Sequence, residues 1–119
     1  MIAIKRAYEA VSKNDGFRVL IDRLWPRGIK KEKLALDAWF KELAPSTALR
    51  KEFGHALAHW ETFQTKYKKE LQSESAQQKI EFIKQLAQTQ RVTLIYGARE
   101  KTHNNATVLK EIIEKESLP

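Results

Sequence analysis

The short run at residues 92–96, Val-Thr-Leu-Ile-Tyr, places the strongest constraint on the fold of this 119-residue chain. It is nearly continuously apolar, and polar and apolar positions do not alternate along it. Such a run is typical of a strand in a parallel sheet whose two faces are both covered by helices. Two further strands are predicted at residues 2–5 and 17–21, and the second follows the turn signal Asn14-Asp15-Gly16.

Helical patterns fill most of the chain between the second and third strands. Ser46 is placed to cap a helix over residues 47–53, which Gly54 would end. Asp37 is predicted to cap a helix over residues 38–43. Two apolar stripes with helical spacing follow, formed by Leu57, Trp60, Phe63, Tyr67 and Leu71 and then by Ile80, Ile83 and Ala87. A last helix is predicted from residue 106 onward, and residues 30–36 are expected to form a short basic helical turn.

This order of elements predicts a single α/β domain over residues 1–119. Its sheet is small, mostly parallel and covered by helices, and a long helical crossover precedes the last strand. A hydrophobic content of 42% is sufficient for one packed core at this length. Three strands are few for such a sheet, so a further strand at an unspecified position is left open.

The composition excludes several classes of site. The chain has no cysteine, which removes disulfides, thiol nucleophiles and zinc–thiolate centres. No apolar run approaches the length of a membrane span, and the apolar stretch at the amino terminus is too short and too charged for a signal peptide. We therefore expect a cytoplasmic protein without a membrane partner. A net charge of +7 favours anionic partners. No Walker, dinucleotide-binding or serine-hydrolase motif is present.

A shaped and charged loop, Asp22-Arg23-Leu24-Trp25-Pro26-Arg27-Gly28, follows the second strand. The exit of the third strand is also polar, from Tyr96 to Asn105. If the two strands are parallel neighbours, both loops open at the edge of the sheet where ligands of α/β proteins gather. The helix behind the second loop, capped by Asn104 or Asn105, would direct its N–H groups toward an anion.

These loops define the candidate site for a phosphate- or nucleotide-like anion. The candidate ligand-binding residues are Arg23, Trp25, Arg27, Arg50, His55, Tyr96 and Asn104, and the candidate proton-transfer groups are Asp22 and His103. His55 and His59 have the spacing of metal ligands, but no third ligand accompanies them, so neither a metal nor a cofactor is expected.

Each of these residues also has a structural interpretation. In this interpretation Asp22 forms a structural ion pair with Arg18, Arg23 or Arg27, and Trp25 closes the end of the core. Tyr96 suits a buried position at the end of its strand, and a structural role for His103 stays open. The sequence does not decide between a ligand and internal partners for these charges.

The same residues resemble those of the YeaO-like proteins, domain of unknown function 488. The matching residues comprise Arg6, Tyr8, 15–28, 36–39, 41–46, Leu49, Arg50, 53–55, Trp60, Phe63, Tyr67, Glu70, Leu71, 93–98, His103 and Asn104. The resemblance covers nearly the whole chain, and its Asp-Arg-Leu-Trp-Pro-Arg-Gly string is highly specific. It implies a compact α/β domain but no chemistry, because the family is itself uncharacterised.

One position departs from the family pattern. Members usually read His-Asn-His-Ala where this chain reads His103-Asn104-Asn105-Ala106. The departure weakens any mechanism that needs a pair of histidines, whereas Asn105 retains the ability to donate or accept a hydrogen bond.

Three functions are therefore considered. The first is a basic pocket that binds a small anion, with or without catalysis. The second is a nucleic-acid-binding protein that uses the basic segment from Arg23 to Lys33. The third is a non-enzymatic interaction domain in which Asp22 and the arginines pair with one another. The sequence leaves the ligand, the reaction and the oligomeric state open.

Overall fold

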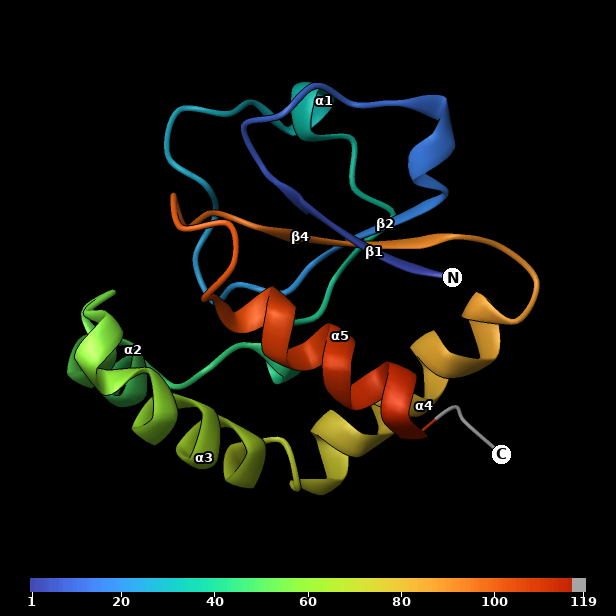
Figure 1. Cartoon of the computed structure of the whole chain (residues 1–119). Helices are drawn as coiled ribbons and strands as arrows, with labels where there is room; N and C mark the ends of the chain where they lie inside the picture. The colour runs from blue at the N-terminus through green and yellow to red at the C-terminus, as the bar shows by residue number, and fades with distance from the viewer. Residues whose placement is uncertain (117–119) are drawn as a thin grey trace.

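The computed structural model describes residues 1–116 and contains one four-stranded sheet (Figure 1). Its strands are β1 (Ile2–Arg6), β2 (Phe17–Leu20), β3 (Ala38–Trp39) and β4 (Val92–Tyr96), in the spatial order β1-β4-β2-β3. Every pairing in this sheet is parallel. The predicted α/β class and parallel sheet are confirmed, and β2 and β4 are direct neighbours.

The α-helices of the described chain are α1 (Lys31–Leu34), α2 (Thr47–Phe53), α3 (Trp60–Glu70), α4 (Glu74–Ala87) and α5 (Asn105–Glu116). Short 3-10 turns lie at Lys13–Asp15, Lys41–Leu43 and Leu57–His59. Helices α2, α3 and α4 form the long crossover before β4, as predicted. None of the helices within residues 1–116 has both the length and the apolarity needed to cross a bilayer.

Local sequence signals set the ends of α2. The Ser46 hydroxyl accepts a hydrogen bond from the Leu49 N–H at 3.1 Å, and Gly54 ends the helix with a positive φ of 53°. Both predictions are confirmed. Ser46 also donates from its hydroxyl to Glu70 at 2.6 Å, which ties the start of α2 to the end of α3.

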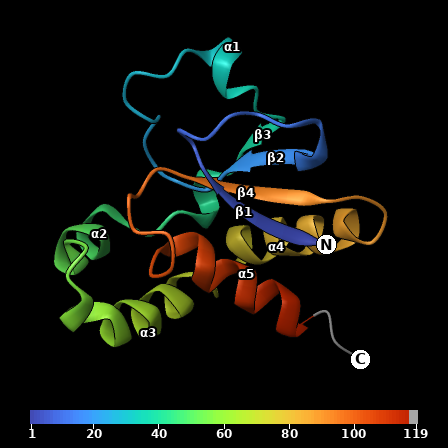
Figure 2. The same ribbon diagram turned by 45° about the horizontal axis from the view of Figure 1, so that its top comes forward.

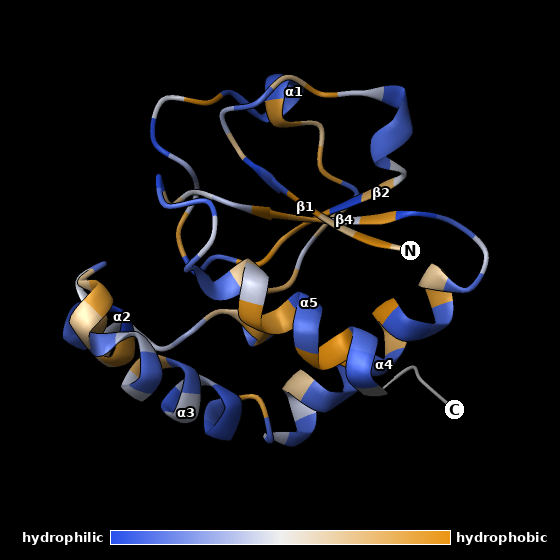
Figure 3. Cartoon of the chain, in the orientation of Figure 1, coloured by the Kyte–Doolittle hydropathy of each residue, from blue (hydrophilic) through white to orange (hydrophobic). Residues whose placement is uncertain are grey.

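The two faces of the sheet are covered unequally. Helices α3, α4 and α5 pack on one face, and α1 and the loops around it lie over the other (Figures 1 and 2). The larger core includes Val19 and Leu94, and the smaller core includes Leu20 and Ile95, so alternate strand residues enter opposite cores. The apolar stripes of α4 and α5 are visible in Figure 3. All five residues of β4 are buried, which explains its continuous apolar run.

The predicted helix over residues 38–43 is wrong. Residues Ala38–Trp39 form strand β3 and only a 3-10 turn follows. Asp37 caps no helix: its carboxylate accepts from the Arg18 N–H at 2.8 Å, and its own N–H donates to the Arg18 carbonyl at 2.8 Å. Pairing with the open edge of β2 satisfies this backbone and overrides the local helical pattern. This segment is the additional strand left open by the sequence.

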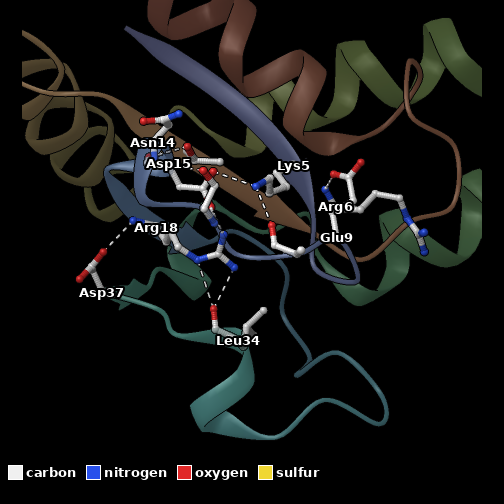
Figure 4. Close-up of polar contacts among 11 residues, drawn as sticks. Lys5, Arg6, Glu9, Asn14, Asp15, Arg18, Leu34 and Asp37 are labelled. Carbon is white, nitrogen blue, oxygen red and sulfur yellow. Dashed lines mark hydrogen bonds and ion pairs between the residues drawn. The ribbon is translucent and has the colours of Figure 1, made fainter.

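A largely buried ion network surrounds Asp15, which precedes the amino end of β2 (Figure 4). The Asp15 carboxylate accepts from Lys5 Nζ at 2.8 Å and from an Arg18 guanidinium nitrogen at 2.6 Å. Arg18, only 3% exposed, also donates two hydrogen bonds to the Leu34 carbonyl at the end of α1. Burial acts to raise the pKa of Asp15, but its hydrogen bonds from Lys5, Ser12 and Arg18 hold that pKa below the ordinary value.

Candidate functional site

Strands β2 and β4 end side by side at the carboxyl edge of the sheet. Leu20 pairs with Ile95, and the Ile21 N–H then donates to the Ile95 carbonyl at 3.1 Å. Immediately beyond the strands, the Gly97 N–H donates to Asp22 Oδ2 at 2.8 Å. The two polar loops predicted to converge are therefore joined directly by this hydrogen bond.

Asp22 also holds the start of helix α5. Its Oδ1 accepts from Asn105 Nδ2 at 2.9 Å, and the same Asn105 amide lies 3.2 Å from the Ile21 carbonyl. Burial raises the pKa of Asp22, and hydrogen bonds from Asn105 and Gly97 offset this only in part. The carboxylate is thus partnered by neutral amides and not by arginine. The ion pair with Arg18, Arg23 or Arg27 that the structural alternative requires is absent within residues 1–116.

Close packing at Gly97 explains why glycine occupies this position. A Cβ atom there would lie 3.1 Å from Asp22 Oδ2, which is tighter than ordinary van der Waals contact. A larger residue would push the carboxylate away from the backbone N–H that it accepts from. Gly97 thereby sets the position of Asp22.

Helix α5 begins at this junction with a reciprocal cap. The Thr107 N–H donates to Asn104 Oδ1 at 3.0 Å, and the Asn104 N–H donates to Thr107 Oγ1 at 3.2 Å. Asn104 Nδ2 also donates to the Glu100 carbonyl at 2.7 Å, which fixes the preceding loop. The positive end of the α5 dipole therefore lies beside Asp22 and its neighbours.

A cavity of about 230 Å³ opens at this edge of the sheet, and we call it the Asp22 cavity. It is lined by Asp22, Arg23, Leu24, Pro45, Arg50, Phe53, His55, Phe63, Gly97, Ala98, Asn104 and Asn105. Its apolar wall includes Phe53 and Phe63, whose rings stack with centroids 4.5 Å apart. The cavity thus combines an aromatic wall with a charged and amide-bearing wall, a combination common in small-ligand sites.

The two arginines of the cavity lack acidic partners. No carboxylate of residues 1–116 lies within ion-pair distance of Arg23 or Arg50. Arg23 makes one long hydrogen bond, from Nε to the Pro45 carbonyl at 3.4 Å, and both side chains belong to exposed residues. Arg50 and His55 interact with Asp22 by charge, and both favour its ionised form. The local excess of positive charge suits an oxyanion.

His55 reaches the cavity through an unusual turn after α2. Gly54 and His55 both adopt positive φ values, 53° and 59°. A left-handed conformation is uncommon for a residue with a side chain, although histidine tolerates it better than most. The turn brings the His55 ring to 5.8 Å from that of Phe53, between their centroids, at the end of the aromatic wall.

The cavity brings together five of the residues predicted from sequence: Asp22, Arg23, Arg50, His55 and Asn104. Trp25 lies elsewhere, on the opposite face of the sheet. Its indole N–H donates to the Ile29 carbonyl at 2.7 Å, and its ring meets that of Trp39 edge-on at 5.6 Å. Arg27 is exposed on the same loop, where its carbonyl accepts from the Tyr8 hydroxyl at 3.0 Å.

Tyr96 and His103 lie near the cavity without lining it. Tyr96 is 2% exposed in the larger core, and burial raises the pKa of its hydroxyl. His103 Nδ1 lies 3.1 Å from Glu100 Oε1, and its ring meets Trp60 edge-on at 5.0 Å. Hydrogen bonds from Thr102 and His103 lower the pKa of Glu100 to about 2. His103 therefore contributes to an interaction between the loop after β4 and α3.

Several lining residues were not among the predicted ligand-binding set. Asn105 was noted only as a departure from the family pattern, yet it is the side chain that joins Asp22 to α5. Phe63 belongs to a helical stripe that predicts core packing, and a stripe does not reveal which member faces a cavity. Gly97 had a usable signal, because a glycine directly after a buried strand often marks a close backbone approach.

A metal centre has no support in the described residues. Within residues 1–116, no three histidine, cysteine, aspartate or glutamate side chains come together as a ligand group. His59, which shares helical spacing with His55, instead has its Nδ1 3.1 Å from the Glu52 carbonyl.

Comparison with known proteins agrees with the resemblance noted in the sequence. The family described as "Inactive DUF488-N3 subclade" matches residues 1–118. The uncharacterised protein YeaO of Escherichia coli (strain K12) is 44% identical over 110 residues, which are 92% of this chain and 94% of YeaO. The uncharacterised protein Rv3073c of Mycobacterium tuberculosis is 31% identical over 112 residues, 94% of this chain and 92% of that protein. No solved structure matches significantly.

Proposed function

The chain belongs to the inactive DUF488-N3 subclade. We propose that its Asp22 cavity binds a small oxyanion, and that the protein does not catalyse a reaction of this ligand. The ligand class is inorganic phosphate or a small phosphate ester. The observation that carries the proposal is the pair of arginines, Arg23 and Arg50, that line the cavity with no acidic partner among residues 1–116. A guanidinium in this state has donors available for the two oxygens of a phosphate.

The start of helix α5 also favours the binding of an anion in the Asp22 cavity. Asn104 and Asn105 line the cavity, so the first turn of a 12-residue helix faces it. Unpaired N–H groups and the helix dipole both stabilise negative charge at such a position. The arginines come from the loop after β2 and from α2, so three separate elements of the fold would contribute to binding one ligand.

The size of the cavity favours a small ligand. Its volume of about 230 Å³ is below the range of roughly 300–1,000 Å³ that is usual for drug-sized ligands. A phosphate with a short or single-ring substituent fits this volume better than a complete nucleotide. The stacked rings of Phe53 and Phe63 would cover the apolar part of that substituent.

Two features support binding without catalysis. Both carboxylate oxygens of Asp22 already accept hydrogen bonds, from Gly97 and Asn105, which hold it as a positioning group. His103, the other candidate for proton transfer, lines no part of the cavity and contacts Glu100 and Trp60. The description of the family as inactive agrees with this division of roles.

Calorimetric titration with inorganic phosphate and with phenyl phosphate, whose substituent is a single ring, tests the proposal. The informative variant is Arg50→Met, and its matched control is Lys51→Met, which removes the same charge from the next residue of α2 without touching the cavity. Arg50→Met should weaken phosphate binding by about tenfold or more, and Lys51→Met by less than about twofold.

Two results would overturn the proposal. One is the absence of saturable binding of either phosphate compound by the unsubstituted protein. The other is an equal loss of affinity in the two variants, which would assign the binding to general positive charge and not to the cavity.

A further inference from the structure

A second cavity, which we call the Tyr8 cleft, lies on the opposite face of the sheet from α3, α4 and α5. It is lined by residues 7–11 of the loop after β1 and by Gly28, Ile29, Lys30 and Lys33 of the segment around α1. Its volume is about 580 Å³, and none of its residues lines the Asp22 cavity. Figures 1 and 2 show the loop after β1 beside the segment that leads into α1.

The cleft exposes apolar and aromatic surface. Tyr8 is 49% exposed and Val11 is 46% exposed, although Ala7, the residue before Tyr8, is buried. The Tyr8 hydroxyl donates to the Arg27 carbonyl at 3.0 Å, and the Arg6 guanidinium lies 5.0 Å from its ring centroid. The ring is therefore held in a fixed position while much of its surface stays accessible.

Positive charge surrounds this ring. Lys30 and Lys33 line the cleft, and Arg27 and Lys31 are exposed on the same segment. None of these four cations forms an ion pair with a carboxylate in the part of the chain that the structure describes. The one acidic residue of the lining, Glu9, is engaged by the Arg6 N–H at 2.8 Å and by Lys101 at 3.7 Å.

The basic segment is held in place by buried contacts. Arg18, within the ion network of Figure 4, donates two hydrogen bonds to the carbonyl of Leu34 at the end of α1. The Trp25 indole N–H donates to the Ile29 carbonyl, and Leu34 is 1% exposed in the smaller core. The lysines are thus presented on a fixed loop, so binding would order little additional backbone.

We infer that the Tyr8 cleft binds single-stranded nucleic acid, with phosphates at Lys30 and Lys33 and a base stacked on Tyr8. A fixed cationic groove beside an exposed aromatic ring is the combination by which such strands are held without sequence readout. An unpaired base can reach this ring, whereas the bases of a duplex are stacked on one another. The helix at this cleft, α1, has only four residues, too few for reading a major groove. This inference is independent of phosphate binding in the Asp22 cavity.

Fluorescence anisotropy with a labelled oligothymidylate of about 12 nucleotides tests the inference in about 50 mM salt. The first variant, Lys30→Ala with Lys33→Ala, should weaken binding about tenfold. In a plot of the logarithm of the binding constant against the logarithm of the salt concentration, its slope should be shallower by about 1.4. Its control is Lys68→Ala with Lys69→Ala, which removes the same charge from exposed positions of α3. The control should change affinity by less than about threefold.

Stacking is tested by two substitutions of one residue. Tyr8→Ala should weaken binding about tenfold, while Tyr8→Phe, which loses only the hydroxyl, should stay within about twofold of the unsubstituted protein. An oligonucleotide of the same length built from abasic sites should bind about tenfold more weakly than oligothymidylate.

The inference is overturned if the two double-lysine variants lose oligothymidylate affinity equally, or if the unsubstituted protein binds the abasic strand as tightly as oligothymidylate. Tighter binding of a duplex of the same length, or of vesicles of phosphatidylcholine with phosphatidylserine, would also contradict it. Arg50→Met should leave oligothymidylate affinity unchanged, so failure here and failure of phosphate binding are separate results.

Discussion

Strand β2 has an aspartate and an arginine near each of its ends, and the two ends use them differently. At the amino end, Asp15 pairs with Lys5 and Arg18; Asp15 and Arg18 are buried, and Lys5 is partly buried (Figure 4). At the carboxyl end, Asp22 accepts hydrogen bonds from Gly97 and Asn105, and the nearby arginines remain without acidic partners. The residue types are the same, but the partners of the carboxylate differ.

The difference separates a structural charge cluster from a candidate binding site. Where a carboxylate is neutralised by buried cations, neither side has capacity left for a ligand. Where neutral amides donate to the carboxylate, the hydrogen-bond donors of the surrounding cations stay available for a ligand. The opposite pKa directions of Asp15, lowered, and Asp22, raised, express the same distinction.

The largest expected effect is at the amino end. Arg18→Met should lower the free energy of unfolding by about 2–4 kcal/mol, because it removes both side-chain donors of the Leu34 carbonyl and leaves the buried Asp15 carboxylate with Lys5 as its only cationic partner. Urea denaturation followed by circular dichroism measures this. The fraction that remains folded should bind phosphate with unchanged affinity, and a loss below about 1 kcal/mol would break the comparison.

At the carboxyl end, Asp22→Ala should lower the free energy of unfolding by less, about 1–2 kcal/mol. The N–H of Gly97 and the amide of Asn105 lose their acceptor, but a partly buried charge is also removed. Phosphate affinity should rise a few-fold, because a negative charge beside Arg50 and His55 is gone. A stability loss as large as that of Arg18→Met would show that the two ends are equally structural.

The two carboxylates should also oppose each other in their pH dependence. The pKa of Asp15 is lowered on folding, so its stabilising effect is complete above the unfolded value near 3.8 and is lost as pH falls through the folded value. The pKa of Asp22 is raised, so its stabilising effect is complete below 3.8 and is lost as pH rises through the folded value.

Carboxyl carbon shifts recorded by NMR between about pH 2 and pH 7 measure both titrations. Asp15 should titrate below 3.8 and Asp22 above it. Asp15→Asn and Asp22→Asn, each missing one of the two resonances, assign the signals. If the titration midpoints of Asp15 and Asp22 lay on the same side of 3.8, the assignment of different partners to the two carboxylates would be contradicted.

The smallest effect is expected at Asn105, whose side-chain amide joins Asp22 to the start of α5. Asn105→His should lose less than about 1 kcal/mol of stability, because an imidazole N–H can also donate to Asp22. Asn105→Leu has similar bulk without a donor and should lose about 1–3 kcal/mol. Equal losses in thermal or urea denaturation would show that the hydrogen bond to Asp22 contributes little.

Much of the fold could be predicted because its signals are local. The apolar run at residues 92–96 indicated a covered strand, and Ser46 and Gly54 marked both ends of α2. Strand β3 could not be predicted in the same way. Two residues carry no periodicity, and Ala38–Trp39 become a strand only because the edge of β2 is available to pair with them.

The candidate site was predictable only in outline. Parallel neighbouring strands imply that Asp22 and the loop after Tyr96 meet, but spacing does not reveal which side chains turn inward. Trp25 follows Asp22 by three residues and packs on the opposite face, while Arg50 reaches the cavity from α2. Such placements depend on tertiary packing, which no window of the sequence contains.

The central claim is that the carboxyl end of β2 is open to an anion and the amino end is closed. Titration of the ¹⁵N-labelled protein with inorganic phosphate, followed by amide chemical shifts, tests this most directly. The account predicts saturable shifts at Gly97, Ala98, Asn105 and Ala106, with none at Asp15 or Arg18. Shifts confined to the exposed lysines, or equal shifts at both ends of β2, would contradict it.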